Sequence, residues 1–310
     1  MHGGHTHGRA GSDRRWLTVA LALITGFMAV EVVIGLLSGS LALLSDAAHM
    51  LTDAAAIALA LFAARMADRP PSGGYTFGLK RAEILSAQAN GLTLLLLAAW
   101  IAYEAVDRLR SPAAVAGFPV LATALAGIAV NLAAAWAVGR ADRRSLNVEG
   151  AFQHVLTDLF AFIATAVAGV VIMLTGFRQA DTIASLFVAA LMVRSGVGLV
   201  RDSGRIFLEA APVGLDPSTL GGDLAAVPGV VEVHDLHVWQ VTSGYPAMSA
   251  HVLVDPGGDC HAVRKDIEAR LRQAYGLDHT TLQVDHAEVV HDDPHCADPH
   301  GAHYRATERP

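Results

Sequence analysis

The stretch Ser45-Asp46-Ala47-Ala48-His49-Met50-Leu51-Thr52-Asp53 decides the fold, because it places three ionisable side chains inside an apolar run over residues 41–64. Asp46, His49 and Asp53 stand at positions i, i+3 and i+7, which share one stripe of a helix with 3.6 residues per turn. An Asp at the centre of a membrane helix costs roughly 2.5 to 3.5 kcal/mol on insertion scales and normally faces the interior of a bundle. The stretch therefore predicts a membrane helix whose polar stripe meets a partner inside the protein.

A second pair with the same spacing, His154 and Asp158, lies in another long apolar run. Two such pairs on two membrane helices offer two imidazoles and two carboxylates, enough to close a tetrahedral shell around zinc or a similar divalent ion. A single pair arises often by chance, and its histidine is then simply hydrogen-bonded in the core. Two copies at matched spacing favour one shared metal site formed by His49, Asp53, His154 and Asp158.

The composition is that of a membrane protein. The 310 residues are 53% hydrophobic and 16% charged, with a mean hydropathy of +0.42, whereas soluble domains carry about 25% charged residues. The formal charge of −7 is uneven: residues 1–208 carry 16 basic and 13 acidic groups, and residues 209–310 carry 6 and 16, together with 10 of the 15 histidines. This acidic region suits cations and argues against nucleic acid or an anionic lipid surface as its partner.

The two cysteines, Cys260 and Cys296, give no disulfide framework, and we expect reduced thiols in a cytoplasmic region. No cleavable signal peptide is expected, because the first apolar run is too long and lacks a small-residue cleavage pattern. Residues 1–15 predict a flexible cytoplasmic tail. Its three histidines, at positions 2, 5 and 7, indicate either weak metal capture or simply a solvated tail or expression tag.

Six apolar segments approach or exceed the roughly 20 residues that a helix needs to cross a bilayer. They cover residues 16–37, 41–64, 83–106, 113–139, 146–175 and 180–200. Gln88, Asn90 and Asn131 lie within these segments, where we expect them to join helices by hydrogen bonds rather than to bind a ligand. The sequence thus predicts an α-helical transmembrane domain over residues 16–208.

Most arginines and lysines of the connecting segments fall on one side of the predicted bundle, and only Arg108, Arg110 and Arg178 fall on the other. By the positive-inside rule, both termini are then cytoplasmic, and we expect the chain to lie in the inner (plasma) membrane of the cell. The second and fifth spans run antiparallel in this topology, so the two His/Asp pairs meet near the midplane. Asp46 is either a proton relay on the exit side or a structural hydrogen-bond acceptor.

Residues 209–290 predict a small α+β domain. The periodicity indicates helices over 217–226 and 261–275 and strands over 230–241, 247–254 and 280–289, in the order α-β-β-α-β. So small a core favours stabilisation by dimerisation or metal binding. Residues 291–310 predict a disordered tail, with adventitious metal binding as the alternative for His291, His295, Cys296, His300 and His303.

Five motifs together resemble the cation diffusion facilitator family of zinc exporters, over most of residues 15–290. They are the stretch 45–53 quoted above, Tyr75-Thr76-Phe77-Gly78-Leu79-Lys80-Arg81-Ala82-Glu83, His154-Val155-Leu156-Thr157-Asp158, His234-Asp235-Leu236-His237-Val238-Trp239 and Thr281-Leu282-Gln283-Val284-Asp285. The resemblance implies a Y-shaped homodimer with six membrane helices per subunit and a metallochaperone-like, ferredoxin-like cytoplasmic domain. It also implies Zn²⁺ export in exchange for protons through the intramembrane His/Asp site.

The same resemblance implies a second, binuclear metal site in the cytoplasmic domain. Its ligands are His234, His251, His261 and Asp285, with His279 as a further candidate. Gln283 stands where some relatives have a histidine, and the loop after the second span keeps only Asp68, so we expect no metal in that loop. The His/Asp set is typical of zinc-preferring members, and the sequence does not rank zinc against cadmium, cobalt, nickel or iron(II).

Zinc needs neutral imidazoles and ionised carboxylates, so protons and metal compete for the predicted membrane site. With histidine titrating near neutral pH, metal-for-proton exchange by alternating access is expected. Two other functions stay open: a membrane-embedded zinc metallohydrolase and a metal sensor without transport. An enzyme is disfavoured, because catalytic zinc keeps an open coordination position, whereas two matched pairs fill four, and no His-Glu-x-x-His motif occurs.

Overall fold

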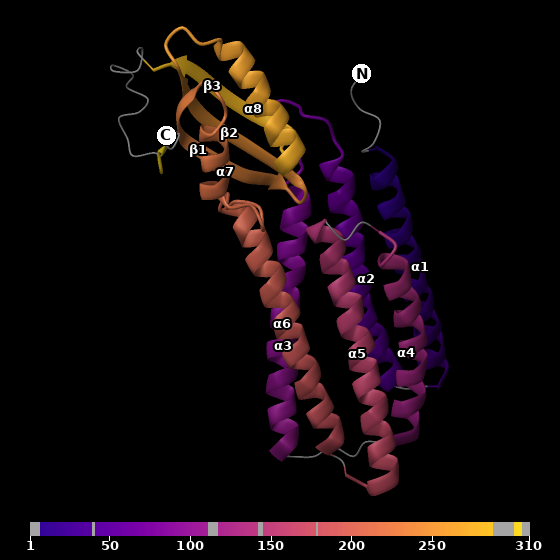
Figure 1. Cartoon of the computed structure of the whole chain (residues 1–310). Helices are drawn as coiled ribbons and strands as arrows, with labels where there is room; N and C mark the ends of the chain where they lie inside the picture. Colours follow the sequence, from indigo (N-terminus) through magenta and orange to yellow (C-terminus); the bar gives the residue numbers. More distant parts are fainter. Residues whose placement is uncertain are drawn as a thin grey trace. The chain divides into compact units, whose positions relative to one another are not determined.

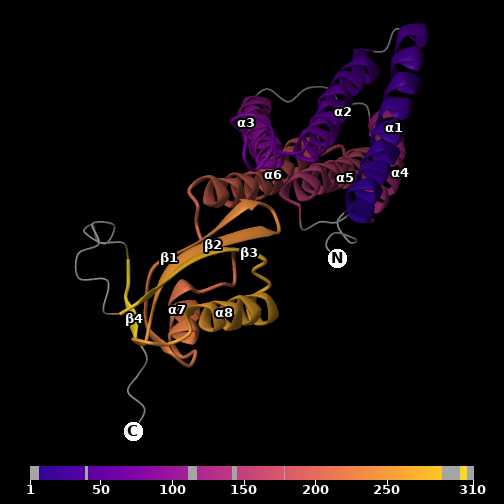
Figure 2. The ribbon, with the colours of Figure 1, turned by 90° about the horizontal axis from the view of Figure 1, so that it is seen from above.

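The computed structural model describes residues 7–38, 41–110, 117–141, 145–177, 179–287 and 301–305. The chain divides into two compact units, Met1–Gly204 and Arg205–Pro310 (Figures 1 and 2). Each unit is described here by itself.

The first unit is a bundle of long helices that run side by side in alternating directions (Figure 1). They are α1 (His7–Ser38), α2 (Leu41–Ala67), α3 (Ala82–Arg110), α4 (Gly117–Val138), α5 (Leu146–Thr175) and α6 (Gln179–Phe207). Within the described residues, α3 to α6 each contain a stretch long and apolar enough to cross a membrane. The described parts of α1 and α2 contain shorter apolar stretches, Arg15–Val30 and Ala54–Ala67.

Large apolar side chains point outward from the bundle. On α3, Leu96, Trp100 and Tyr103 are 74%, 65% and 72% exposed and follow one another at helical spacing. Exposed apolar side chains of this size are rare in soluble monomers when they form a continuous surface, and they are the rule where a helix faces lipid.

The second unit is a four-stranded sheet with two helices on one of its faces (Figure 2). Its elements are α7 (Pro217–Ala225), β1 (Val230–Thr242), β2 (Tyr245–Val254), α8 (Cys260–Tyr275), β3 (His279–His286) and β4 (Tyr304–Arg305). The strand order is β3-β2-β1-β4, with β1 antiparallel to both β2 and β4 and β2 parallel to β3. Helix α8 makes the crossover that a parallel pair requires.

Local sequence signals account for the ends of these helices. Asp216 precedes α7 and its carboxylate accepts hydrogen bonds from the backbone N–H groups of Ser218 and Thr219, as an N-cap residue does. Asp259 caps α8 in the same way. Gly276 then ends α8 with φ of +64°, a conformation that glycine adopts without steric cost.

The structure differs from the expectations of the sequence at both ends of the chain. Helix α1 begins at His7, inside the segment expected to be a flexible tail. At the other end, Tyr304 and Arg305 form β4, inside the segment 291–310 expected to be disordered. The Tyr304 ring packs against the core of the sheet and lies where a side chain at Gly221 would collide with it, and Arg305 pairs with Glu232.

Candidate metal sites

His154 and Asp158 lie inside the helix bundle on consecutive turns of α5. Their side chains are nearly fully buried, and Nε2 of His154 lies 3.7 Å from Oδ2 of Asp158. Residues at i and i+4 on a helix are neighbours, so the spacing in the sequence accounts for this contact. Burying an imidazole and a carboxyl group together is costly unless they are paired or coordinate an ion.

His49 and Asp53 lie in α2, and their side chains are outside the part of the chain that the structure describes, as is that of Asp46. The residues beside both His/Asp pairs do belong to one buried apolar cluster. It includes Met50 and Ala54 of α2 and Ala151 and Val155 of α5. Residues of α2 and α5 next to the two pairs therefore belong to one shared core.

A hydrogen bond between these helices sets their register. Nδ2 of Asn147, near the start of α5, donates to the carbonyl oxygen of Ala60 in α2 at 2.7 Å. The helices are antiparallel (Figure 1), so a step forward along α5 and a step backward along α2 run in the same direction. Seven residues after Asn147 is His154, and seven residues before Ala60 is Asp53. Each of these steps is about 10 Å long at a rise of 1.5 Å per residue. The backbone positions of His154 and Asp53 are therefore at nearly the same level.

The sheet brings together two of the five histidine and aspartate residues expected in a cytoplasmic site. His234 of β1 and His251 of β2 are cross-strand partners, with ring centroids 5.4 Å apart. Asp235 follows His234 with φ of +50° at a break in the strand register, and its carboxylate lies 3.7 Å from Nε2 of His251. The left-handed conformation is one that aspartate tolerates better than most residues.

Among the described residues, none of the other three joins this pair in a group of three ligand atoms that all lie within 4.8 Å of one another. Asp285 of β3 accepts a hydrogen bond of 3.0 Å from Gln283, which itself stands beside His251 in the sheet. His261 is exposed in the first turn of α8. His279 is exposed at the start of β3, with its ring 5.8 Å from that of Tyr245. The four-residue site that the family resemblance implies stays a prediction.

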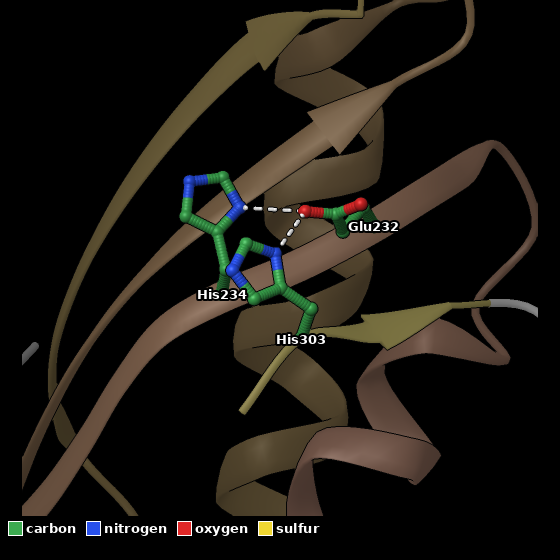
Figure 3. Close-up of side chains that lie close together, drawn as sticks. All are labelled: Glu232, His234 and His303. Carbon is green, nitrogen blue, oxygen red and sulfur yellow. Dashed lines mark hydrogen bonds and ion pairs between the residues drawn. The ribbon is translucent and has the colours of Figure 1, made fainter. Parts of the chain in front are cut away.

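A cluster that the sequence did not indicate lies beside His234, at the β1–β4 edge of the sheet (Figure 3). Oε1 of Glu232 is 3.3 Å from Nδ1 of His234 and 2.6 Å from Nδ1 of His303. Among the described residues, this is the one group of three or more His, Cys, Asp or Glu whose ligand atoms all lie within 4.8 Å of one another. Side chains two residues apart in a strand point to the same face, so Glu232 lies on the same face as His234. This spacing was the one signal in the sequence that could have pointed to Glu232 as a neighbour of His234.

The electrostatics of this cluster follow from burial and hydrogen bonding. Burial raises the pKa of Glu232, but hydrogen bonds from His303 and Arg305 outweigh it and hold that pKa below its usual range. Burial lowers the pKa of His234. At neutral pH, Glu232 is therefore ionised and His234 neutral, the forms in which these side chains bind a metal ion.

Comparison with known proteins identifies two family regions. The cation efflux transmembrane domain matches residues 17–208, and the cytoplasmic domain of the cation efflux protein matches residues 217–287. A solved structure, the metal-bound C-terminal domain of the CzcD transporter from Cupriavidus metallidurans, is 30% identical. The match covers 23% of this protein and 97% of the solved domain, with a TM-score of 0.22.

Relatives match over nearly the full length of the chain. The cadmium, cobalt and zinc/H(+)-K(+) antiporter of Bacillus velezensis is 37% identical over 93% of this chain and 94% of its own. The zinc transporter ZitB of Pectobacterium atrosepticum is 39% identical over 94% and 91%, and the metal cation efflux system protein CzcD of Cupriavidus metallidurans is 35% identical over 92% and 90%. The chain therefore belongs to the cation diffusion facilitator, or cation efflux, family of membrane proteins.

Proposed function

We propose that the protein exports Zn²⁺, or a similar divalent cation, from the cytoplasm in exchange for protons. The helices α1 to α6 cross the inner membrane, with both termini in the cytoplasm. The cation is carried at a site formed by His49, Asp53, His154 and Asp158. The observation that supports this proposal is the hydrogen bond from Asn147 of α5 to Ala60 of α2, since equal steps of seven residues from it lead to His154 and to Asp53.

The donor set accounts for the coupling to protons. Two imidazole nitrogens and two carboxylates suit a tetrahedral cation of borderline softness, with bonds of about 2.0 to 2.2 Å. The histidines must be neutral and the aspartates ionised to bind it, so arrival of the metal displaces protons and arrival of protons displaces the metal. The burial of His154 and Asp158 also requires the ion to lose its water shell, which suits a carrier better than a fast channel.

The named relatives support a group of related substrates. Their names include zinc, cadmium and cobalt, all divalent cations that accept mixed nitrogen and oxygen ligands. We propose zinc as the main substrate of this chain. A competition assay with cadmium, cobalt, nickel and iron(II) in one vesicle preparation would rank them.

The second unit, in this proposal, joins two copies of the chain in the cytoplasm and senses the metal. The cytoplasmic family region covers most of it, and residues 209–310 carry the acidic excess of the chain. Zinc bound to the second unit would reduce repulsion between two such acidic regions. A sensing role of this kind requires zinc to bind one dimer state more tightly than the other.

Zinc flux into proteoliposomes, measured with and without a higher proton concentration inside the vesicles, tests the transport proposal. Asp158→Asn keeps the size of the side chain but removes its charge. Loss of a residue that only orients a metal ligand typically lowers metal affinity or activity by about 10 to 100-fold. Loss of a ligand itself should cost at least as much, so we expect zinc flux to fall at least tenfold. Asp202→Asn, at an exposed position of α6, is the matched control and should transport as the wild type does.

Two results would defeat the proposal. Unchanged flux in Asp158→Asn would remove the site, and zinc binding by the wild type without any flux would indicate a metal sensor instead. A metallohydrolase, the alternative from a different class, would release product from a substrate without moving zinc. The names of the relatives quoted above describe transporters and efflux proteins and no hydrolase.

A further inference from the structure

The C-terminal strand β4 carries its side chains to the edge of the sheet beside β1. Arg305 is the register partner of Glu232, and Tyr304 that of Val233. One further step along this antiparallel pair sets His303 opposite His234. Tyr304 points into the core, so His303 and Arg305, on either side of it, lie on the face of the sheet away from α7 and α8.

The three potential ligands converge on one point. The imidazole rings of His234 and His303 are stacked, with centroids 5.3 Å apart and planes 19° apart, and one nitrogen of each ring is aimed at the same oxygen of Glu232 (Figure 3). In a tetrahedral zinc site with bonds of about 2.0 to 2.1 Å, neighbouring donor atoms lie about 3.3 Å apart. The distance from Oε1 of Glu232 to Nδ1 of His234 is already 3.3 Å. The distance from the same oxygen to Nδ1 of His303 is 2.6 Å and must increase slightly for a metal ion to bind.

The burial and charge of the cluster fit a cation. Glu232 and His234 are both buried although they lie on the face of the sheet without helices. Arg305 binds the second carboxylate oxygen, Oε2, at 2.7 Å and leaves Oε1 directed at the two imidazoles. The carboxylate is thus held in place by one oxygen while the other remains available for a metal.

We propose that Glu232, His234 and His303 form a binding site for a zinc-like divalent cation, and that the bound cation fastens the C-terminal strand β4 to the edge of the sheet. The site lies in the second unit and is separate from the intramembrane transport site. It differs from the cytoplasmic set His234, His251, His261 and Asp285 in using Glu232 and His303. The two cytoplasmic sets compete for His234.

The simpler alternative is a fastening that needs no metal. Arg305 and His303 would then hold β4 through their contacts with Glu232 alone. The two explanations differ in one measurable respect. Only the metal site makes the attachment of β4 depend on zinc.

Trypsin offers a direct measurement, because it cleaves after Arg305 and releases residues 306–310 as one peptide, the Arg309–Pro310 bond being resistant. A strand held against the sheet is protected from proteolysis in proportion to how rarely it opens. Full-length protein in detergent is digested with chelator or with a series of free zinc concentrations, and peptide release is followed by mass spectrometry. A soluble reporter peptide in the same digest corrects for any effect of zinc on trypsin.

In the wild type, zinc at ten times its dissociation constant should slow release about tenfold, since ligand binding to the closed form stabilises it by the factor 1 + [L]/Kd. His303→Ala and Glu232→Gln should each lose this zinc effect. His237→Ala, at an exposed histidine that belongs to neither set, is the matched control and should keep it. His261→Ala tests the other cytoplasmic set. Circular dichroism of each variant confirms that the sheet is intact.

Two outcomes would overturn the proposal. No effect of zinc on the wild type would leave the ion-pair attachment of β4 as the explanation. A zinc effect that survives in His303→Ala would assign the metal to other ligands, and its loss in His261→Ala would identify the other cytoplasmic set. Zinc flux of His303→Ala in proteoliposomes is read separately, so failure here does not affect the transport proposal.

Discussion

The amide side chain of Asn147 links α5 to α2. It is buried, and its Nδ2 donates to the carbonyl oxygen of Ala60 on the neighbouring helix. Asn90 of α3 makes a similar bond to the carbonyl oxygen of Gly150 at 2.8 Å, so α5 is tied to two helices near its first turns. Bonds of this type between membrane helices fix position as well as adding stability.

We predict that Asn147→Ala reduces both the thermal stability and the zinc flux of the protein. Interhelical hydrogen bonds in membranes contribute on average about 0.6 kcal/mol and at most about 1.7 kcal/mol, so a loss near 1 kcal/mol is expected. Flux should fall further than stability, because α2 can then shift against α5 and separate the two His/Asp pairs. Thermal unfolding in detergent and the proteoliposome assay measure the two effects.

Asn131→Ala is the control for this prediction. Asn131 is equally buried, but its Nδ2 donates to the carbonyl oxygen of Gly127 within the same helix, α4. Its loss should affect stability without changing the register between helices, so flux should stay near that of the wild type. If Asn131→Ala lost as much flux as Asn147→Ala, a general loosening of the bundle would explain both results.

At the scale of elements, α3 and α6 approach closely because each has a glycine at the contact. A Cβ placed on Gly196 would lie 2.9 Å from the carbonyl oxygen of Gly91 and 2.8 Å from Cγ of Leu95. Next to this contact, α3 and α6 share a small apolar cluster that includes Leu94 and Met192. Small residues at such a position allow membrane helices to pack on their backbones.

We predict that Gly196→Ala destabilises the bundle while Gly198→Ala, on the same helix, does not. The first substitution forces the α3 backbone away, and overpacking of this kind typically costs about 1 to 3 kcal/mol. The second meets nothing within 4 Å and gains helix propensity, which favours alanine over glycine by about 1 kcal/mol. Melting temperatures of the two variants in the same detergent give the comparison, and equal values would show that the helices do not meet at Gly196.

The regular elements could be predicted from the sequence, and the reason is periodicity. The fifth helix was expected at residues 146–175 and is found as Leu146–Thr175, because a long and mainly apolar run lies between Ser145 and Gly176, which occupy its N-cap and C-cap positions. Asn90 was expected to join helices, which is confirmed, whereas the same expectation for Asn131 is wrong, since its partner lies in its own helix. Periodicity predicts that a polar side chain lies in a helix, but it does not predict which group that side chain hydrogen-bonds.

Prediction was poorest where pairing depends on residues far apart in the chain. Strand β4 has two residues and no periodic pattern, and it forms because Tyr304 packs over Gly221 while Arg305 meets Glu232. The cluster of Glu232, His234 and His303 was missed for the same reason. His234 was selected from a motif, but its neighbours were set by a strand that the sequence did not reveal.

At the scale of the whole molecule, the described residues of each unit form hydrophobic cores of their own. The core of the second unit is made by α7, α8, the sheet and the loops that connect them, and Val233, Val252, Ile267 and Leu271 are completely buried in it. Both of its helices carry their own N-caps, Asp216 and Asp259. A segment with its own core, caps and sheet satisfies the requirements of a domain that folds independently.

We predict that residues 205–310, produced alone, fold cooperatively and that Ile267→Ala lowers their free energy of unfolding by about 2 to 5 kcal/mol. Truncating a fully buried isoleucine removes its burial and leaves a cavity between α8 and the sheet. Val213→Ala is the control, because Val213 is 84% exposed, and such surface changes stay within about 0.5 kcal/mol. Urea unfolding followed by circular dichroism measures both. An isolated segment without a cooperative transition would mean that the second unit depends on the membrane helices for its fold.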